Sequence, residues 1–414
     1  MSNSKRKIVN DPVFGFVNIP DGLIFRLINH PYVQRLNRIK QLGLAFYVYP
    51  GAVHTRFHHS LGAMHLMSEA VNQLRTNGHQ ITDEEEESAM ACILLHDTGH
   101  GPFSHVLENA LVSGVSHEDI SLLLMNRINA EENGLLDTAI AIFRDEYPKR
   151  FLHQLVSGQL DVDRLDYLRR DSFFTGVTEG NIGSARIIKM LNLKDDRLVV
   201  EAKGIYSIEN FLMARRLMYW QVYLHKTAVA AEKMLISAMS RAKFLAAQGV
   251  KLEACPALLY FLYKEVDKTR FLTETEAIDN YAAMDDNDIW CALKTWTQSP
   301  DRVLALLAYG LVNRRLFKIE YFSEPVSQKI IDEKKASLSK RYNISADEAA
   351  FLVSSDEIST NMYSEADDSI DILYRDGTTK DISVASDMLN IQLLSKKIGK
   401  YYLCYLRDSV FEKA

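Results

Sequence analysis

The sequence predicts a mostly α-helical protein with a smaller α+β lobe at its C-terminal end. Apolar residues recur at intervals of three and four through residues 20–170, which is the spacing of one helix face. From residue 207 through residue 246 the chain lacks glycine and proline, which favours a long helix or a pair of helices. Beyond residue 323 short β-prone stretches flank an Asp-Gly turn.

The first elements are expected to be short helices. Residues 20–43 carry helical apolar spacing on both sides of His30-Pro31, so they form two short helices. Residues 60–78 continue as an amphipathic helix that Asn77-Gly78 can end. The acidic run at 83–87 suits the N-terminus of the next helix, and another helix can begin after the Gly-Pro pair at 101–102.

The later elements include predicted strands. Residues 191–204 read as a β-hairpin with its turn at Asp195-Asp196. An exposed helix is expected over 323–342, and strands are expected around Asp376-Gly377 within 357–386. Residues 396–406 are predicted to form a final strand. We therefore divide the chain into a larger domain, residues 1–322, and a smaller α+β lobe, residues 323–414.

Composition excludes several classes of protein. Lysine and arginine number 48 against 54 acidic residues, a formal net charge of −6, so no general polyanion-binding surface is expected. The four cysteines lie far apart, without the spacing of a thiolate zinc site or a disulfide framework. No secretory signal and no stretch of about 18 apolar residues occurs, so we expect a cytoplasmic protein that does not cross a membrane.

The strongest signal is a concentration of histidine and aspartate. Seven of the 12 histidines lie in two windows, 54–65 and 96–105. Neutral imidazole and carboxylate are ligands for divalent metals, and the adjacent pair His96 and Asp97 can approach one ion only from flanking directions. Further ligands must come from other helices. A histidine of "RFHHS" is one candidate, and an aspartate of "GQLDVDRLDYLRRD" is the other: Asp161, Asp163, Asp166 or Asp171.

Each piece also has an ordinary explanation. A His-Asp dipeptide is common, and a single histidine on an apolar helix is usually a hydrogen-bonded core residue. The segment "DVDRLDYLRRD" alone could be an exposed helix with ion pairs three and four residues apart. Their combination favours a mononuclear metal site.

These segments resemble a known family. "RFHHSLG", "HDTGHGPFSH", "SHED" and "DVDRLDYLRRD", in this order, are similar to the HD-domain phosphohydrolases, particularly the deoxynucleoside triphosphate (dNTP) triphosphohydrolases. The resemblance runs from Asn10 to about Lys226, with its core motifs in 51–171. It implies an HD-domain helical core and one divalent ion per subunit (Mn, Mg, Fe, Ni or Zn). The ligands that it implies are His59, His96, Asp97 and Asp163.

The resemblance also implies catalytic and phosphate-binding residues. His100, His105 and His117 would lie by the phosphates, with Glu108 orienting His117 for acid-base work. Arg56 and the metal would withdraw charge from an α-phosphate while water, activated by the metal or by a histidine, attacks phosphorus. The products would be a deoxynucleoside and tripolyphosphate.

The remaining implied contacts are those of the substrate. Arg164, Tyr167 and Arg215 match residues that hold the phosphates, whereas Gln41, Leu42, Asp171 and Tyr223 match residues that select deoxyribose. Two departures concern other contacts. Leu224 replaces a base-facing glutamine, so the preferred base is open. Asn29 and Asn37 replace residues that recognise an activating guanine, although Lys7, Asn10 and Gln34 fit some nucleotide effector at a subunit boundary.

The leading hypothesis is a metal-dependent dNTP triphosphohydrolase that forms a homodimer or homotetramer. One alternative is an HD phosphohydrolase acting on a nucleoside monophosphate, a cyclic dinucleotide or an alarmone. The other is a weakly catalytic nucleotide sensor or nucleic-acid-binding oligomer. Among the remaining histidines, His54 is expected to line the cleft and His65 to be structural, and His58 has no assigned role.

Overall fold

The computed structural model describes residues 7–360, 369–387 and 398–407. It is predominantly helical with small sheets, which confirms the predicted fold class. The N-terminal hairpin pairs β1 (Lys7–Asp11) with β2 (Gly15–Ile19). Short helices follow, as predicted on both sides of His30: α1 (Leu23–Asn29), α2 (Pro31–Arg35), η1 (Leu36–Arg38) and η2 (Gly43–Tyr47).

A helical bundle follows and holds the residues of interest. Its members are α3 (Arg56–Thr76), α4 (Asp83–Leu95), α6 (His117–Glu131), α7 (Asp137–Phe143), α8 (Arg150–Val156) and α9 (Val162–Thr175). The expected acidic start of α4 is a capping box, in which Thr82 and Glu85 satisfy each other's backbone N–H groups. The helix α3 ends at Asn77, as its sequence predicts.

The segment after Gly101-Pro102 departs from the predicted helix. It forms only a 3-10 turn, η3 (Ser104–Val106), and one short helix, α5 (Glu108–Leu111). Phe103 and Ser104 have positive φ angles of 55° and 49°, so the chain cannot enter a right-handed helix there. The bent backbone is held from outside, because the Phe103 N–H donates to Asp286 Oδ1 over 2.8 Å.

The middle of the chain contains the predicted hairpin and helix pair. Strands β3 (Leu191–Lys194) and β4 (Arg197–Glu201) are joined by Asp195 and Asp196, both in the left-handed region. The long helical run is interrupted by a π-helical turn. Its parts, with the neighbouring elements, are η4 (Thr178–Gly180), α10 (Ser184–Met190), η5 (Ala202–Gly204), α11 (Ile205–Met218), η6 (Tyr219–Tyr223) and α12 (Lys226–Ala247).

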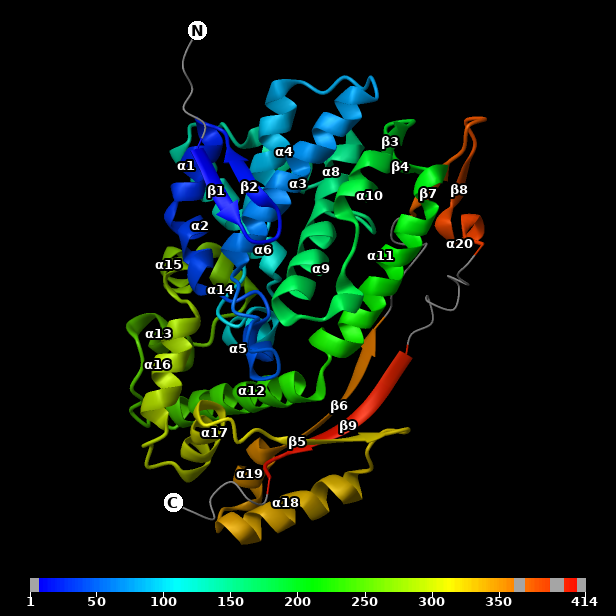
Figure 1. Ribbon diagram of the computed structural model, residues 1–414. Helices are drawn as coiled ribbons and strands as arrows, with labels where there is room; N and C mark the ends of the chain where they lie inside the picture. The colour runs from blue at the N-terminus through cyan, green and yellow to red at the C-terminus, as the bar shows by residue number, and fades with distance from the viewer. Residues whose placement is uncertain (1–6, 361–368, 388–397, 408–414) are drawn as a thin grey trace.

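The second hydrophobic core gathers around α12. The helices that contribute to it are α13 (Pro256–Tyr263), α14 (Lys268–Thr273), α15 (Thr275–Ala283), α16 (Asp286–Trp296) and α17 (Arg302–Val312). The first core lies between α3, α4 and α9. Figure 1 shows α12 running across one end of the bundle, next to the strands of the C-terminal segment. This helix therefore connects the bundle to that segment.

The C-terminal segment contributes to two sheets. Strand β9 (Ile398–Tyr405) lies between β5 (Lys318–Phe322) and β6 (Val353–Thr360), with α18 (Gln328–Tyr342), α19 (Ala346–Ala349) and η7 (Ala350–Leu352) beside them. Strands β7 (Asp371–Leu373) and β8 (Thr379–Asp381), followed by α20 (Ile382–Ala385), extend the β3–β4 hairpin instead. The domain boundary at residue 322 stays a prediction. Within the described ranges, no helix has the length and apolarity to cross a membrane.

Candidate active site

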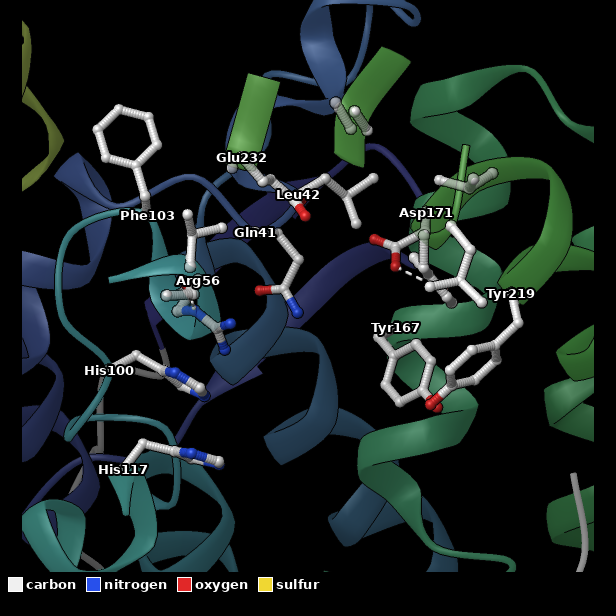
Figure 2. A pocket seen from close by; sticks show the side chains of 18 of the residues that line it. Gln41, Leu42, Arg56, His100, Phe103, His117, Tyr167, Asp171, Tyr219 and Glu232 are labelled. Atoms are coloured by element: carbon white, nitrogen blue, oxygen red, sulfur yellow. Dashed lines mark hydrogen bonds between the residues drawn. The ribbon is translucent and has the colours of Figure 1, made fainter. Parts of the chain in front are cut away.

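One cavity of about 630 Å³ opens where the bundle meets α12. Its volume lies in the usual range of small-molecule sites. It is lined by polar residues from several segments (Figure 2), and the sequence-predicted residues among them are Gln41, Leu42, Arg56, Asp97, His100, His117, Asp163, Arg164, Tyr167, Asp171 and Tyr223. Segments more than 100 residues apart therefore meet in one space.

At one side of this cavity lies a group that could hold a metal. His59 comes from α3, His96 and Asp97 come from the end of α4, and Asp163 comes from the first turn of α9. One ligand atom each of His59, His96 and Asp163 lies within 4.8 Å of the others. The carboxylate of Asp97 is beside them, since its oxygens lie 3.3 Å from His96 Nε2 and 3.7 Å from His59 Nε2.

The other ring nitrogens of both histidines are already used. His59 Nδ1 lies 2.7 Å from Asp166 Oδ2, and His96 Nδ1 lies 2.6 Å from the carbonyl of Ile93. Both partners are acceptors, so each Nδ1 carries a proton, and each Nε2 is the nitrogen that faces the carboxylates of Asp163 and Asp97. Both Nε2 atoms are buried without a hydrogen-bond partner among the described residues. An N/O donor set with two such orphaned nitrogens fits a divalent ion.

A buried ionic network holds His59. Arg170 donates three hydrogen bonds to the Asp166 carboxylate through Nε and Nη2, at 2.8 to 3.3 Å, and a fourth through Nη1 to Asp11 Oδ2 at 2.7 Å. Burial disfavours the charged carboxylate, but Arg170 and His59 outweigh it and lower the pKa of Asp166. Gly62 makes room for this network, because a Cβ there would lie 2.0 Å from Asp166 Oδ1.

Asp97 connects the metal group to the phosphate side of the cavity. Arg56 Nη1 donates to Asp97 Oδ2 at 2.5 Å, and its Nε donates to Ser104 Oγ at 2.7 Å. His100 Nε2 lies 3.2 Å from Asp97 Oδ1. Burial opposes ionisation of Asp97, but His96 and Arg56 hold its pKa well below the usual range. Burial and Arg56 lower the pKa of His100, so this imidazole is neutral near pH 7.

His117 is oriented by a carboxylate, as the resemblance implied. Its Nδ1 lies 3.1 Å from Glu108 Oε1, which also accepts the backbone N–H of His117 at 2.7 Å. The ring stacks on His100 with centroids 4.1 Å apart. Gly99 permits this approach of α6, because a Cβ would lie 2.1 Å from the carbonyl of His117. The side chain of His105 lies outside the described part of the structure.

At the opposite side of the cavity, Asp171 is held by two donors. His54 Nε2 lies 2.8 Å from Asp171 Oδ1, and the Tyr223 hydroxyl donates to Asp171 Oδ2 at 2.8 Å. His54 stacks on Phe174 with centroids 4.5 Å apart. It is buried but is not among the residues that line the cavity, so it braces Asp171 from behind. Gln41 Oε1 is buried without a hydrogen-bond partner among the described residues.

Of the three residues expected to contact phosphates, two line the cavity and one does not. Arg164 lines the cavity while its Nε donates to the carbonyl of Gly158 at 2.6 Å and to Asp161 Oδ2 at 3.1 Å. Tyr167 also lines the cavity, beside Tyr219 in Figure 2. Arg215 does not: it is buried, and its Nη1 donates to Gln159 Oε1 at 3.1 Å.

Two histidines of the first window have structural contacts. His58 occupies the third position of α3, where its Nδ1 accepts from the backbone N–H of Thr55 at 3.2 Å. The imidazole thus replaces the carboxylate of an ordinary capping box. His65 packs on Phe14 with ring centroids 5.6 Å apart.

Sequence reasoning missed four contributors to the site. Asp166 was one of four open candidates for a ligand but instead orients His59. Asp286 holds Lys40 N at 2.9 Å as well as Phe103 N. Tyr219 and Glu232 line the cavity. In the sequence each of these is a single residue without a motif around it that marks its role, so only the fold identifies it as part of the site.

Comparisons with known proteins agree with this geometry. A family model described as "HD domain" matches residues 56–171, and one described as "HD associated region" matches residues 182–254. The uncharacterized protein YwfO of Bacillus subtilis is 30% identical over 418 residues, which cover 98% of this chain and 94% of that protein. The chain belongs to the HD-domain phosphohydrolase family.

Two further similar proteins have names that state an activity. This chain is 64% identical in sequence to a phosphohydrolase from Bacteroides thetaiotaomicron. The crystal structure of that protein matches this fold with a TM-score of 0.95, over 97% of this chain and 100% of that chain. The deoxynucleoside triphosphate triphosphohydrolase SAMHD1 of Homo sapiens is 29% identical over 280 residues. That match covers 57% of this chain and 44% of the human protein, so the chain spans less than half of that relative's length.

Proposed function

We propose that this HD hydrolase cleaves dNTPs to deoxynucleosides and tripolyphosphate. One observation carries the proposal: Gln41, Leu42, Asp171 and Tyr223 line the same cavity as Arg56, Asp97, His100 and His117. The first four suit a deoxyribose, and Arg56, His100 and His117 suit phosphates beside the proposed metal ligand Asp97. The similarity to proteins named dNTP triphosphohydrolases supports the same assignment.

The cofactor would be one divalent ion held by His59, His96, Asp97 and Asp163. When bound, it would supply Lewis-acid activation of a phosphoryl group. Arg56 would stabilise negative charge on the phosphate oxygens, since its guanidinium lies beside Asp97 and Ser104 at the cavity wall. Arg164, on the same cavity, would bind the outer phosphates.

His117 would move the protons. Glu108 holds the proton on Nδ1, so Nε2 is the nitrogen that would accept a proton from water or return one. Water forms a bond to the α-phosphorus as the bond from that phosphorus to O5′ breaks. O5′ takes a proton, so the deoxynucleoside and the intact tripolyphosphate leave.

Asp171 would recognise the sugar. Each of its oxygens accepts one hydrogen bond, from His54 or from Tyr223, and an ionised carboxylate has lone pairs for further donors. A 3′-hydroxyl is such a donor. Tyr223, held by the same carboxylate, would close the space that a 2′-hydroxyl needs.

Ion chromatography of the products tests the function. With Mn²⁺ or Mg²⁺ and each dNTP and ribonucleotide, we expect tripolyphosphate and deoxynucleoside from dNTPs only. Asp97→Ala should abolish both products. Asp279→Asn, an exposed partner of Arg127 outside the cavity, is the matched control and should retain them. Orthophosphate or pyrophosphate from other esters, with none from dNTPs, would favour the alternative HD phosphohydrolase.

We further propose that the protein is cytoplasmic and acts as a homodimer or homotetramer with a nucleotide effector at a subunit boundary. Lys7, Asn10 and Gln34 are the residues proposed for this boundary. In the structure Lys7 and Asn10 belong to β1, and Gln34 donates to the carbonyl of Ile28 at 2.8 Å. Light scattering with and without nucleotides measures the assembly. A monomer under every condition would exclude this part of the proposal.

A further inference from the structure

The end of the cavity beyond the sugar residues is walled by α12. Ala228, Glu232 and Ile236 line the cavity, and their spacing of four residues places them on one stripe of this helix. Figure 2 shows Glu232 beside Leu42, away from His100 and His117. This stripe therefore lies apart from both the phosphate-side histidines and Asp171, and it borders the part of the cavity that we assign to the base.

The wall around Glu232 is largely apolar. Leu42, Phe103, Val106 and Leu224 line the cavity with Ala228 and Ile236. Such a surface suits the flat faces of a nucleobase, but it gives no means of telling one base from another. Base selection at this wall therefore depends on its polar groups.

Glu232 has no partner within the described residues. No donor there lies within hydrogen-bonding distance of its carboxylate. The adjacent Lys233 also lines the cavity, but its Nζ donates to Asp356 Oδ2 of β6 at 2.9 Å. Burial raises the pKa of Glu232 to about 7, and Lys233 opposes this only in part. Because this carboxylate lines the cavity without a partner among the described residues, it would gain from a ligand that brings hydrogen-bond donors.

We infer that Glu232 is the residue that selects the base and that it selects guanine. An ionised carboxylate offers two acceptor oxygens and no donor. Guanine carries two adjacent donors, N1–H and the N2 amino group, which can meet both oxygens at once. Adenine and cytosine present one donor beside an acceptor on the same edge, and thymine presents a single donor between two acceptors, so none of these bases makes this pair of hydrogen bonds. This inference rests on the proposed function.

The test compares the four dNTPs in the wild type and in Glu232→Gln. Glutamine keeps the size of the side chain but replaces one acceptor by a donor. We expect the wild type to favour dGTP over dATP in kcat/KM by about tenfold or more, the size of a good two-point contact. In the variant the dGTP to dATP ratio of kcat/KM should fall about tenfold, while kcat for dATP should change little. Glu276→Gln, on α15 and outside the cavity, is the matched control.

A second measurement separates this inference from the proposed function. Calorimetric titration with each deoxynucleoside measures the base contact without any phosphate chemistry. Preferential binding of deoxyguanosine that Glu232→Gln removes supports the inference even where no dNTP is hydrolysed. Hydrolysis of dNTPs without a guanine preference, or with a preference that the variant retains, would overturn it and leave the function standing. The absence of both dNTP hydrolysis and deoxyguanosine binding would overturn the inference and the proposed function together.

Discussion

The imidazole Nδ1 of His59 donates to the Asp166 carboxylate over 2.7 Å, at a position where both side chains are fully buried. This hydrogen bond fixes which ring nitrogen carries the proton. It leaves Nε2 turned toward Asp163 Oδ1, 3.0 Å away. The chemistry of the proposed metal site thus depends on a residue that does not itself face the cavity.

The first prediction concerns Asp166. Asp166→Asn removes the charge that holds the Nδ1–H tautomer, so the affinity for a divalent ion should fall about 10- to 100-fold. Elemental analysis after dialysis against graded metal concentrations measures this change. Asp195→Asn, in the exposed hairpin turn, should retain the wild-type affinity. Equal affinities in all three proteins would contradict this role of Asp166.

The second prediction concerns the contact between α3 and α9. Gly62→Ala would place a Cβ 2.0 Å from Asp166 Oδ1 and 2.1 Å from Arg170 Nη2. The helices must separate, so the free energy of unfolding should fall by about 1–3 kcal/mol or more. Urea denaturation measures the loss. Gly183→Ala, whose Cβ would meet only Arg186 Cβ at 3.8 Å, should be close to neutral.

Histidines 58 and 59 should behave differently although they are adjacent. His58→Glu restores an ordinary capping box with Thr55, so thermal stability and metal content should be retained. His59→Gln should lose the metal because its Nε2 is one of the proposed ligands. Loss of metal in the His58 variant, measured by the same elemental analysis, would refute the capping role.

Glu108 is predicted to act through His117. Glu108→Gln weakens the hold on the Nδ1 proton, so kcat should fall about 10²-fold with little change in KM. Glu108→Asp keeps the charge and should recover part of the rate. A steady-state pH profile is the informative readout, since a purely structural defect would leave its apparent pKa values in place.

The base preference should depend on pH. Burial raises the pKa of Glu232 to about 7, so this group is mainly ionised at pH 8 and mainly protonated at pH 6. Only the ionised form accepts both guanine donors. The dGTP to dATP ratio of kcat/KM should therefore fall as pH drops through about 7, and this fall should be absent in Glu232→Gln. A ratio that is constant from pH 6 to pH 8 in the wild type would contradict the assignment.

Local sequence rules account for much of this fold. The turns at His30-Pro31, Asn77-Gly78 and Asp195-Asp196 end or join elements as the sequence predicts. These features depend on backbone conformations that a few residues determine. The segment after Gly101 could not be predicted in this way, because its backbone is held by Asp286, which lies 183 residues from Phe103 in the chain.

The candidate site likewise contains some residues that the sequence predicts and others that only the fold reveals. The resemblance of the dense motifs to the HD-domain phosphohydrolases implies His59, His96, Asp97 and Asp163, and these four side chains lie together in the structure. Glu232 stands as a single charge on a long helix, where an exposed position is the usual expectation. Arg215 matches a phosphate contact in sequence, yet its side chain turns to Gln159. Side-chain direction across a tertiary contact is not encoded in local spacing.

The most direct test of the proposed reaction is single-turnover hydrolysis of a dNTP in ¹⁸O-labelled water, followed by ³¹P NMR. Attack at the α-phosphorus with cleavage of its bond to O5′ places one ¹⁸O on a terminal phosphorus of tripolyphosphate and none in the deoxynucleoside. This is the result that we predict. Label found in a deoxynucleoside monophosphate, in pyrophosphate or in orthophosphate would contradict it, because a different bond would have been broken.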